Sequence, residues 1–357
     1  MSLYAQNTIV KEDIQMIVDT NDIPWDRLKE KTVAVTGATG LIGRTMVWAL
    51  LEANKKYNLG LQILAFVRNE AKAQDMYTGV NKTGLTFVCQ DILKPVPKDI
   101  KADFLIHGAS ITASKMMVEQ PVETITTAID GTRNMMEFAA GCQMEGVVYL
   151  SSMEAYGIVP DGCGEVREAD LGYIDPLNIR SSYSEGKRMV ECLCASYASE
   201  YGVPVKIARL AATFGAGIDP WENRVFAQFA RSVIAGEDIV LHTKGEKANC
   251  YCYTVDAITG ILLLLLKGEV GQAYNVCNMD TFCSIKEMAD TFVRVGNCSS
   301  KLVFDIPEDL ASLGYAPTSI MKLNSEKIMQ LGWRPRVDMP TMADRLMQSI
   351  RVDEEGR

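Results

Sequence analysis

The most regular feature of the chain is an alternation of short apolar runs and longer amphipathic stretches, which begins at Thr32. The runs have the length of strands, and the stretches between them have apolar residues at helical spacing. Near-continuous apolar strands separated by helices predict a parallel sheet that is covered on both faces. The predicted strands are 32–35, 63–67, 86–88, 104–106, 147–150, 205–208 and 273–276, and the clearest predicted helices are 41–53, 122–140 and 183–201.

Composition narrows the class of protein. Hydrophobic residues make up 48% of the chain and charged residues 23%, which is the ordinary globular balance. A formal net charge of -9 argues against a nucleic-acid partner, because phosphate binding requires a basic surface. The N-terminus shows no secretory signal. The most apolar stretch, 261–266, is far shorter than the about 20 residues that span a bilayer. We therefore expect a cytoplasmic protein without a membrane partner, in which 261–266 is a buried helix.

The number and spacing of the cysteines and histidines argue against a metal site and a Ser-His-Asp triad. None of the ten cysteines sits in a C-x-x-C pair, so no metal site is predicted. The pairs Cys192/Cys194 and Cys250/Cys252 are separated by one residue, which on a strand places both side chains on one face. We interpret them as buried reduced thiols. With two histidines in the chain, a Ser-His-Asp triad or a His-rich metal site is nearly excluded.

A glycine-rich turn follows the first predicted strand and opens the first predicted helix. Its first glycine permits the tight turn, its second lets the backbone approach a pyrophosphate, and its third lets helix and strand pack closely. The helix N-terminus supplies free N–H groups and a positive dipole end for an anion. This position in the pattern predicts a dinucleotide-binding site. The candidate cofactor-binding residues here are Gly37, Thr39, Gly40, Leu41, Ile42 and Gly43.

The spacing Thr-Gly-x-x-Gly-x-x-Gly over 36–43 resembles the motif of extended short-chain dehydrogenases/reductases of the NAD-dependent epimerase/dehydratase family. The resemblance covers nearly the whole chain from about Thr32. It implies a Rossmann-type doubly wound parallel sheet with a smaller mixed α/β substrate domain, and an NAD or NADP cofactor. It also implies that Asp91 and Ile92 contact the adenine. The segment with Gly108, Ala109 and Ser110 would lie beneath the nicotinamide ribose.

The end of the second strand usually distinguishes the two cofactors. An acidic residue there binds the 2'-hydroxyl of NAD. This chain has Arg68 instead, with Lys72 close behind. A guanidinium suits the 2'-phosphate of NADP through charge-assisted hydrogen bonds, which favours NADP. The alternative is that Arg68 stacks on the adenine and discriminates nothing.

A second motif, Tyr183-x-x-x-Lys187, opens the predicted helix 183–201. Spacing of i and i+4 places both side chains on one helix face. A nearby ammonium and a positive nicotinamide would lower the tyrosine pKa from about 10. The phenolate could then take a proton from a sugar hydroxyl while the adjacent carbon gives hydride to the cofactor. Ser152, after the strand 147–150, could hydrogen-bond the reacting oxygen. Tyr183 and Lys187 are also cofactor-binding candidates.

Glu154 is the most informative residue near Ser152. The segment 151–157 resembles the family's S-[ST]-x-E-x-Y-G motif, whose acid is typical of nucleotide-sugar dehydratases and decarboxylases and generally absent from simple 4-epimerases. The segment 180–188 is most similar to UDP-glucuronate decarboxylases. Sugar-nucleotide 4,6-dehydratases usually have an acidic residue at Met153, which weakens that assignment. The catalytic candidates are Ser152, Glu154, Tyr183 and Lys187.

The chain departs from the family at two positions that normally hold the sugar nucleotide. Ala212 stands where the family usually has Asn, and Asn249 where it usually has a diphosphate-binding Arg. Both changes remove a polar contact, so an unusual substrate or a different binding mode is expected. Arg180 and Arg224, with Lys247, could compensate. The substrate-binding candidates are therefore Arg180, Ala212, Arg224 and Asn249.

The domain boundaries follow from these assignments. We predict an N-terminal extension over 1–30, with a short helix over 9–18 packed on the body. The NAD(P)-binding Rossmann domain would cover 31–215 and return at about 250–277. The substrate-binding domain would comprise 216–249 and 278–357. A homodimer is expected.

Three functions remain open on this evidence. The first is redox-neutral modification of a nucleotide-activated sugar through a 4-keto intermediate, by decarboxylation, dehydration or epimerisation. The second is net reduction of a small ketone or aldehyde with NADPH, which Arg68 and the altered Ala212 and Asn249 favour. The third is a non-catalytic dinucleotide sensor, against which the presence of Ser152, Tyr183 and Lys187 argues. In each case the partner is a small molecule.

Overall fold

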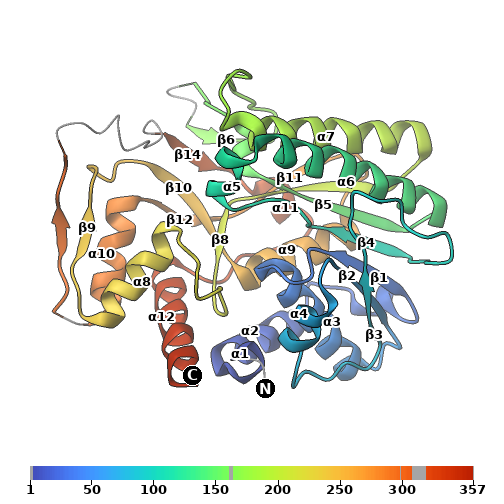
Figure 1. Ribbon diagram of the computed structural model, residues 1–357, viewed down its shortest axis with the longest axis horizontal. Helices are drawn as coiled ribbons and strands as arrows, with labels where there is room; N and C mark the ends of the chain where they lie inside the picture. The colour runs from blue at the N-terminus through green and yellow to red at the C-terminus, as the bar shows by residue number, and fades with distance from the viewer. Residues whose placement is uncertain (1–2, 161–163, 298, 308–318, 357) are drawn as a thin grey trace.

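The computed structural model describes residues 3–160, 164–297, 299–307 and 319–356. Its centre is a seven-stranded sheet of order β11-β7-β5-β4-β1-β2-β3, in which every neighbouring pair is parallel (Figure 1). The seven predicted strands all lie in this sheet, which confirms the Rossmann-type fold. They are β1 (Thr32–Thr36), β2 (Gln62–Val67), β3 (Leu85–Cys89), β4 (Phe104–His107), β5 (Gly146–Ser152), β7 (Val205–Leu210) and β11 (Ala273–Val276).

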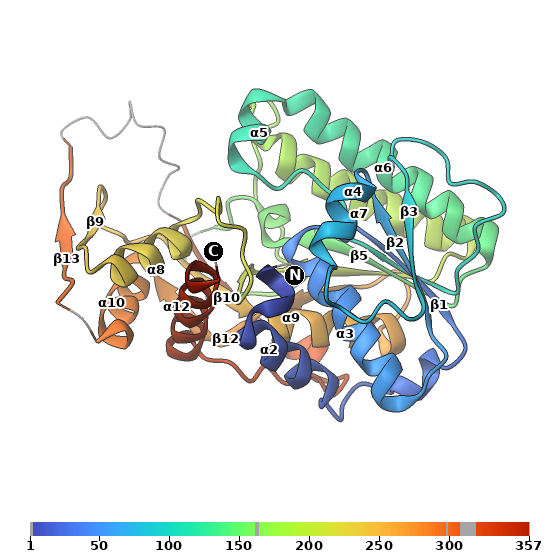
Figure 2. The same ribbon diagram turned by 60° about the horizontal axis from the view of Figure 1, so that its bottom comes forward.

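Helices cover both faces of this sheet, as predicted. On one face lie α3 (Leu41–Tyr57) and α9 (Thr254–Lys267), and on the other α6 (Pro121–Cys142) and α7 (Ser181–Tyr201), as Figure 2 shows. Side chains of β1 alternate between the two interiors, with Val33 and Val35 in one hydrophobic cluster and Ala34 in the other. The apolar run 261–266 lies buried inside α9. Within the described residues, no helix combines the length and apolarity needed to cross a bilayer.

A second, smaller mixed sheet lies beside the first, as predicted. Its order is β12-β10-β14-β6, with β8 paired to β10; the β10–β12 pair is antiparallel and the others are parallel. The strands are β6 (Glu165–Val166), β8 (Ala212–Phe214), β10 (Ala248–Tyr253), β12 (Asn278–Ser284) and β14 (Ile320–Leu323). Near it lie α8 (Val225–Ala235), α10 (Ile285–Gly296), α12 (Met339–Glu355) and the strand pair β9 (Ile239–Leu241) and β13 (Leu302–Phe304).

Strands that follow one another along the chain alternate between the two sheets. β6 lies in the second sheet although it falls inside the predicted Rossmann segment 31–215, and β11 returns to the first sheet beside β7. The boundaries proposed for the two domains therefore stay predictions. Four further short elements lie around the two sheets: α4 (Glu70–Met76), α5 (Ser114–Glu119), α11 (Glu326–Met329) and the 3-10 turn η2 (Met153–Tyr156).

The N-terminal residues form α1 (Leu3–Gln6), α2 (Thr8–Val18) and the 3-10 turn η1 (Trp25–Leu28), so the helix predicted over 9–18 is confirmed. Asn7 caps α2 and its amide also donates to the Ser349 carbonyl of α12 at 2.9 Å. Asp13 of α2 accepts hydrogen bonds from the Tyr253 hydroxyl at 2.7 Å and from Arg345 Nε at 2.9 Å. These bonds join the extension to the second sheet and to α12.

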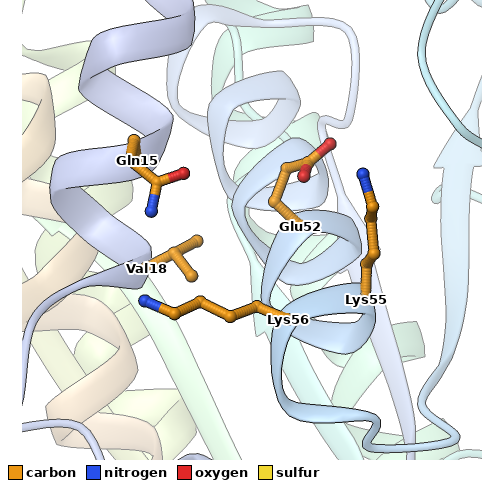
Figure 3. A pocket seen from close by; sticks show the side chains of 5 residues that line it. All are labelled: Gln15, Val18, Glu52, Lys55 and Lys56. Carbon is orange, nitrogen blue, oxygen red and sulfur yellow. The ribbon is translucent and has the colours of Figure 1, made fainter.

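A hollow of about 260 Å³ lies between α2 and α3 (Figure 3). It is lined by Gln15, Val18, Glu52, Lys55 and Lys56. None of these residues belongs to a predicted site segment, so this hollow is separate from the candidate active site.

The cysteine interpretation is correct for one pair and wrong for the other. Cys250 and Cys252 are fully buried on strand β10. Cys192 and Cys194 lie on helix α7, where a two-residue spacing turns side chains to different sides, so Cys192 is exposed and Cys194 is buried.

Candidate active site

The cofactor motifs meet where the strand order reverses. From β1 the chain continues to β2 and β3 on one side, and then crosses to β4, β5 and β7 on the other. In such sheets ligands bind at the carboxyl ends of the strands at this point. The glycine turn follows β1 and the segment 108–110 follows β4. Thr36 Oγ1 joins them by accepting hydrogen bonds from the backbone N–H of Gly108 at 3.1 Å and of Ala109 at 3.0 Å.

The geometry of the glycine turn fits a dinucleotide pyrophosphate. Gly37 has φ +70°, which favours glycine. A Cβ at Gly43 would lie 2.1 Å from the Gly37 carbonyl oxygen, so the close approach of α3 to the turn after β1 requires glycine there. Gly40 is the N-cap of α3 without a side-chain cap, and a Cβ on it would meet only the Gly37 oxygen at 3.4 Å. The first N–H groups of α3, from Leu41, therefore remain available to an anion.

Three further cofactor candidates lie near the same edge of the sheet. Arg68 follows β2 directly and is exposed. Asp91 lies two residues after β3, is exposed, and accepts a hydrogen bond from the Leu93 N–H at 3.0 Å. Ile92 is buried and packs so tightly on α6 that a Cβ at Gly131 would lie 2.6 Å from it. Ile92 thus has a packing role in addition to the predicted adenine contact.

The three reactive side chains come together from two elements. Ser152 ends β5, and its hydroxyl oxygen accepts the Glu154 N–H at 3.2 Å. Tyr183 lies in the first turn of α7, and a hydrogen bond to Ser152 is among the interactions that act on its phenol. Lys187 is buried, with Nζ 5.6 Å from the centroid of the Tyr183 ring, and it donates to the Leu150 carbonyl at 2.7 Å.

The predicted lowering of the Tyr183 pKa depends on the positive nicotinamide and stays a prediction; in the protein without cofactor the pKa is raised. Burial, and after it the Glu154 carboxylate, raise the pKa of Tyr183 to about 12. Ser152, Arg180 and Arg224 act in the opposite direction. Burial also lowers the pKa of Lys187 to about 8. The chain alone therefore keeps Tyr183 protonated, and phenolate formation requires an added positive charge.

Glu154 and two of the candidate arginines lie around Tyr183. The Glu154 carboxylate pairs with Arg180 at 3.4 Å, and both side chains are about two-fifths exposed. Nη1 of Arg180 is buried and has no hydrogen-bond partner in the structure. Arg224 caps α8, pairs with Glu222 at 2.6 Å and acts electrostatically on Tyr183. A carboxylate and two guanidinium groups thus lie beside the predicted base.

The other two substrate candidates lie on paired strands of the second sheet. Ala212 opens β8 and is in register with Tyr251 of β10. Asn249 lies two residues earlier on β10, is buried, and interacts with the Tyr251 hydroxyl. An amide is uncharged, so Asn249 offers no positive charge to pair with a diphosphate.

Sequence reasoning missed the part that Thr36 and His107 have in the site. His107 Nδ1 lies 2.7 Å from Thr36 Oγ1 and its Nε2 lies 3.0 Å from Thr132 Oγ1. Burial lowers the pKa of His107 to about 3, so the ring is neutral and orients Thr36 rather than transferring protons. The threonine that opens the Thr-Gly-x-x-Gly-x-x-Gly motif was the available signal, because its hydroxyl can bond a neighbouring segment.

Residues 33–277 match the model of the NAD dependent epimerase/dehydratase family. The chain belongs to this family. Together with the parallel sheet and the motifs at its carboxyl edge, the match makes it an enzyme of the extended short-chain dehydrogenase/reductase type.

Similar proteins include UDP-glucuronic acid decarboxylase 3 of Arabidopsis thaliana, which is 27% identical over 321 residues, covering 86% of this chain and 85% of the relative. Human dTDP-D-glucose 4,6-dehydratase is also 27% identical, covering 86% of each chain. Among solved structures, dTDP-glucose 4,6-dehydratase from Streptomyces venezuelae with NAD bound superposes with a TM-score of 0.74. Its identity is 20%, with 91% of this chain and 98% of that chain covered, so it shows the fold alone.

Proposed function

We propose that the enzyme modifies a nucleotide-activated sugar through a 4-keto intermediate, with decarboxylation of a sugar acid as the net reaction. The observation that supports this best is the Glu154–Arg180 pair beside Tyr183, 3.4 Å between carboxylate and guanidinium. The named activities of the relatives, nucleotide-sugar decarboxylation and dehydration, favour it over NADPH-dependent reduction of a small ketone or aldehyde.

The first step is proton removal from the sugar 4-hydroxyl by Tyr183. The turn with Gly37, Gly40 and Gly43 would hold the oxidised cofactor, which would supply the acceptor for the C4 hydride and a positive charge close to the phenol. That charge offsets the burial that holds the Tyr183 pKa near 12. Lys187 fixes the reacting geometry from its bond to the Leu150 carbonyl, and Ser152 hydrogen-bonds the reacting oxygen.

The second step acts on the 4-keto sugar. A ketone at C4 makes the C5 proton acidic, and a C6 carboxylate becomes β to a carbonyl and is readily lost. Arg180 offers a buried Nη1 that lacks a hydrogen-bond partner and is suited to an anionic group of the sugar. Loss of the C6 carboxylate as carbon dioxide leaves an enolate over C4 and C5, which takes up a proton at C5. Glu154, beside Arg180, is placed to orient or relay that proton, and the hydride then returns to C4. Arg224 is a second guanidinium near Tyr183, and it is suited to the diphosphate of the substrate.

The test is direct turnover. The purified protein is incubated with NAD or NADP and with UDP-glucuronate, UDP-glucose or dTDP-glucose, and products are followed by nuclear magnetic resonance. Release of carbon dioxide and a pentose product from UDP-glucuronate is the expected result. A 4-epimer or a 6-deoxy-4-keto product as the main product would overturn decarboxylation, and consumption of external NADPH with a simple ketone would favour the reductase.

We propose further that Arg68 gives the site a preference for NADP over NAD. Arg68→Asp is expected to lower the ratio of NADP to NAD affinity by about 10- to 100-fold, the value of one charge-assisted hydrogen bond. Isothermal titration calorimetry with both cofactors measures this ratio, and Lys244→Asp, at an exposed lysine between β9 and β10, is the matched control. An unchanged ratio would show that Arg68 does not contact the 2'-position.

We propose a homodimer in which α6 and α7 face the same helices of a second copy. Both helices cover one face of the sheet, and their outer side exposes apolar side chains, among them Val122 at 67% and Met189 at 55%. Analytical ultracentrifugation should give twice the 39.4 kDa chain mass, and Met189→Glu should give the monomer. Val240→Glu, at an exposed valine of β9, is the control. A wild-type monomer would contradict the proposal.

A cytoplasmic location belongs to the same proposal. Eight cysteines in the described residues are free thiols, a pattern that fits a reducing compartment.

A further inference from the structure

A buried carboxylate on α7 has no part in the steps proposed above. Glu191 lies one helical turn after Lys187 and is 8% exposed. Its partner is Arg209 of β7, whose Nε donates to both carboxylate oxygens at 3.0 and 3.1 Å and whose Nη2 donates at 2.6 Å. A buried ion pair is often no more stabilising than apolar residues of the same size. Its position beside the reactive groups therefore suggests a role in the reaction.

The carboxylate of Glu191 is bonded to the strand that ends in Ser152. Ser151 Oγ donates to Glu191 Oε1 at 2.5 Å, and Lys187 Nζ donates to the carbonyl of Leu150 at 2.7 Å. Two residues one turn apart on α7 thus bind two consecutive residues of β5. The helix that holds Tyr183 and the strand that ends in Ser152 are tied together by these two bonds.

The guanidinium of Arg209 extends the connection to the turn that holds Glu154. Its carbon lies 4.7 Å from the centroid of the Tyr156 ring, at the end of η2. The Tyr156 hydroxyl donates to Asn275 Oδ1 at 2.6 Å, and the Asn275 amide donates to the carbonyls of Val166 and Asn324, beside the second sheet. The buried pair therefore contacts residues on both sides of Glu154, Ser151 through a hydrogen bond and Tyr156 through its ring.

We infer that Glu191 is a positioning residue for the reaction: its carboxylate fixes Ser151 next to Ser152 and places a negative charge one helical turn from Lys187. This inference rests on the proposed function, because it concerns the same reactive groups. Lys187 is buried, so an adjacent carboxylate is the simplest means to keep its ammonium charged.

The surroundings of Lys187 show why the charge of Glu191 matters. On its own helix Lys187 faces Tyr183, Glu191 and Cys194; from η2 it faces Glu154. From β5 it faces the ring of Tyr149 at 4.8 Å, and from β4 the neutral His107. Burial lowers the pKa of Lys187 to about 8, and Glu191 is the largest influence in the opposite direction. Without that charge the ammonium would be lost at a lower pH.

The experiment is the pH dependence of kcat in Glu191→Gln. A reaction that needs the Lys187 ammonium loses rate as the pH rises through the pKa of Lys187. In Glu191→Gln the alkaline limb of the kcat profile should therefore move to lower pH by about one unit or more. Since one pKa unit is a tenfold change in the protonated fraction, kcat on that limb should fall at least about tenfold. Glu191→Asp keeps the charge and should restore the position of the limb. Glu200→Gln, at an exposed carboxylate of the same helix, is the control.

An unmoved alkaline limb in Glu191→Gln would overturn the inference, because a purely structural role changes activity without moving the profile. If this variant does not fold, Arg209→Gln is added to remove the unpaired buried guanidinium, and the same profile is measured. If the wild-type enzyme turns over none of the nucleotide sugars, the proposed function fails. The inference is then decided by nuclear magnetic resonance titration of isotope-labelled Lys187: a lower pKa in Glu191→Gln supports it, and an equal pKa overturns it.

Discussion

Replacing Tyr183 by phenylalanine is expected to lower turnover by about 100- to 10,000-fold, the usual cost of losing one acid–base group, with little effect on cofactor affinity. The phenolate of Tyr183, formed once a positive charge is bound nearby, is the group beside Ser152 and Lys187 that can take the hydroxyl proton. Neither histidine can replace it. His107 is buried and neutral with a pKa of about 3, and His242 lies against Asp305 near the β9–β13 pair.

The measurement combines steady-state kinetics with calorimetric titration of the cofactor. Tyr201→Phe, at an exposed tyrosine of the same helix, should behave as wild type. Because burial and Glu154 hold the Tyr183 pKa high, bound oxidised cofactor should move the acid limb of kcat to a pH well below 12. Near-normal turnover of Tyr183→Phe would refute the proposed mechanism, since no other described group lies where the Tyr183 hydroxyl does.

The parallel sheet was predictable because each of its strands is a continuous apolar run between two helical stretches. The second sheet was predictable only as a smaller mixed region. Its strand β6 has two residues, Glu165 and Val166, and β8 has three, Ala212–Phe214. Segments this short contain no periodic signal, and their pairing depends on distant partners such as Lys322↔Glu165.

The candidate site was predictable where residues lie within one local motif. Ser152 and Glu154 belong to one segment, and Tyr183 and Lys187 to one helical turn. Interactions between distant segments were not predictable, and the Glu191–Arg209 pair is an example, because β7 meets α7 only in the fold. The raised pKa of Tyr183 in the protein without cofactor was not predictable, because the sequence shows neighbouring charges and does not show the degree of burial.

Glu154→Gln distinguishes decarboxylation and dehydration from epimerisation and simple reduction. It is expected to arrest the enzyme after the first hydride transfer. Glu154 lies in η2 with its carboxylate 3.4 Å from Arg180, in reach of solvent and of a bound sugar. The amide keeps the shape of the side chain and removes its basicity and charge. Proton transfer at C5 or loss of the C6 carboxylate should then slow by at least about 100-fold. Tyr183, Lys187 and Ser152 are unchanged, so C4 oxidation should survive.

The signature of that arrest is reduced cofactor. With UDP-glucuronate and oxidised cofactor, stopped-flow absorbance in the near ultraviolet should rise toward one equivalent per chain and stay there, whereas the wild-type signal should be transient. Glu237→Gln, at an exposed carboxylate between α8 and β9, should resemble wild type. A 4-epimerase or a simple reductase needs no acid at this position. Full turnover of Glu154→Gln without a build-up of reduced cofactor would therefore refute decarboxylation and dehydration together, and would assign the Glu154–Arg180 pair to substrate binding alone.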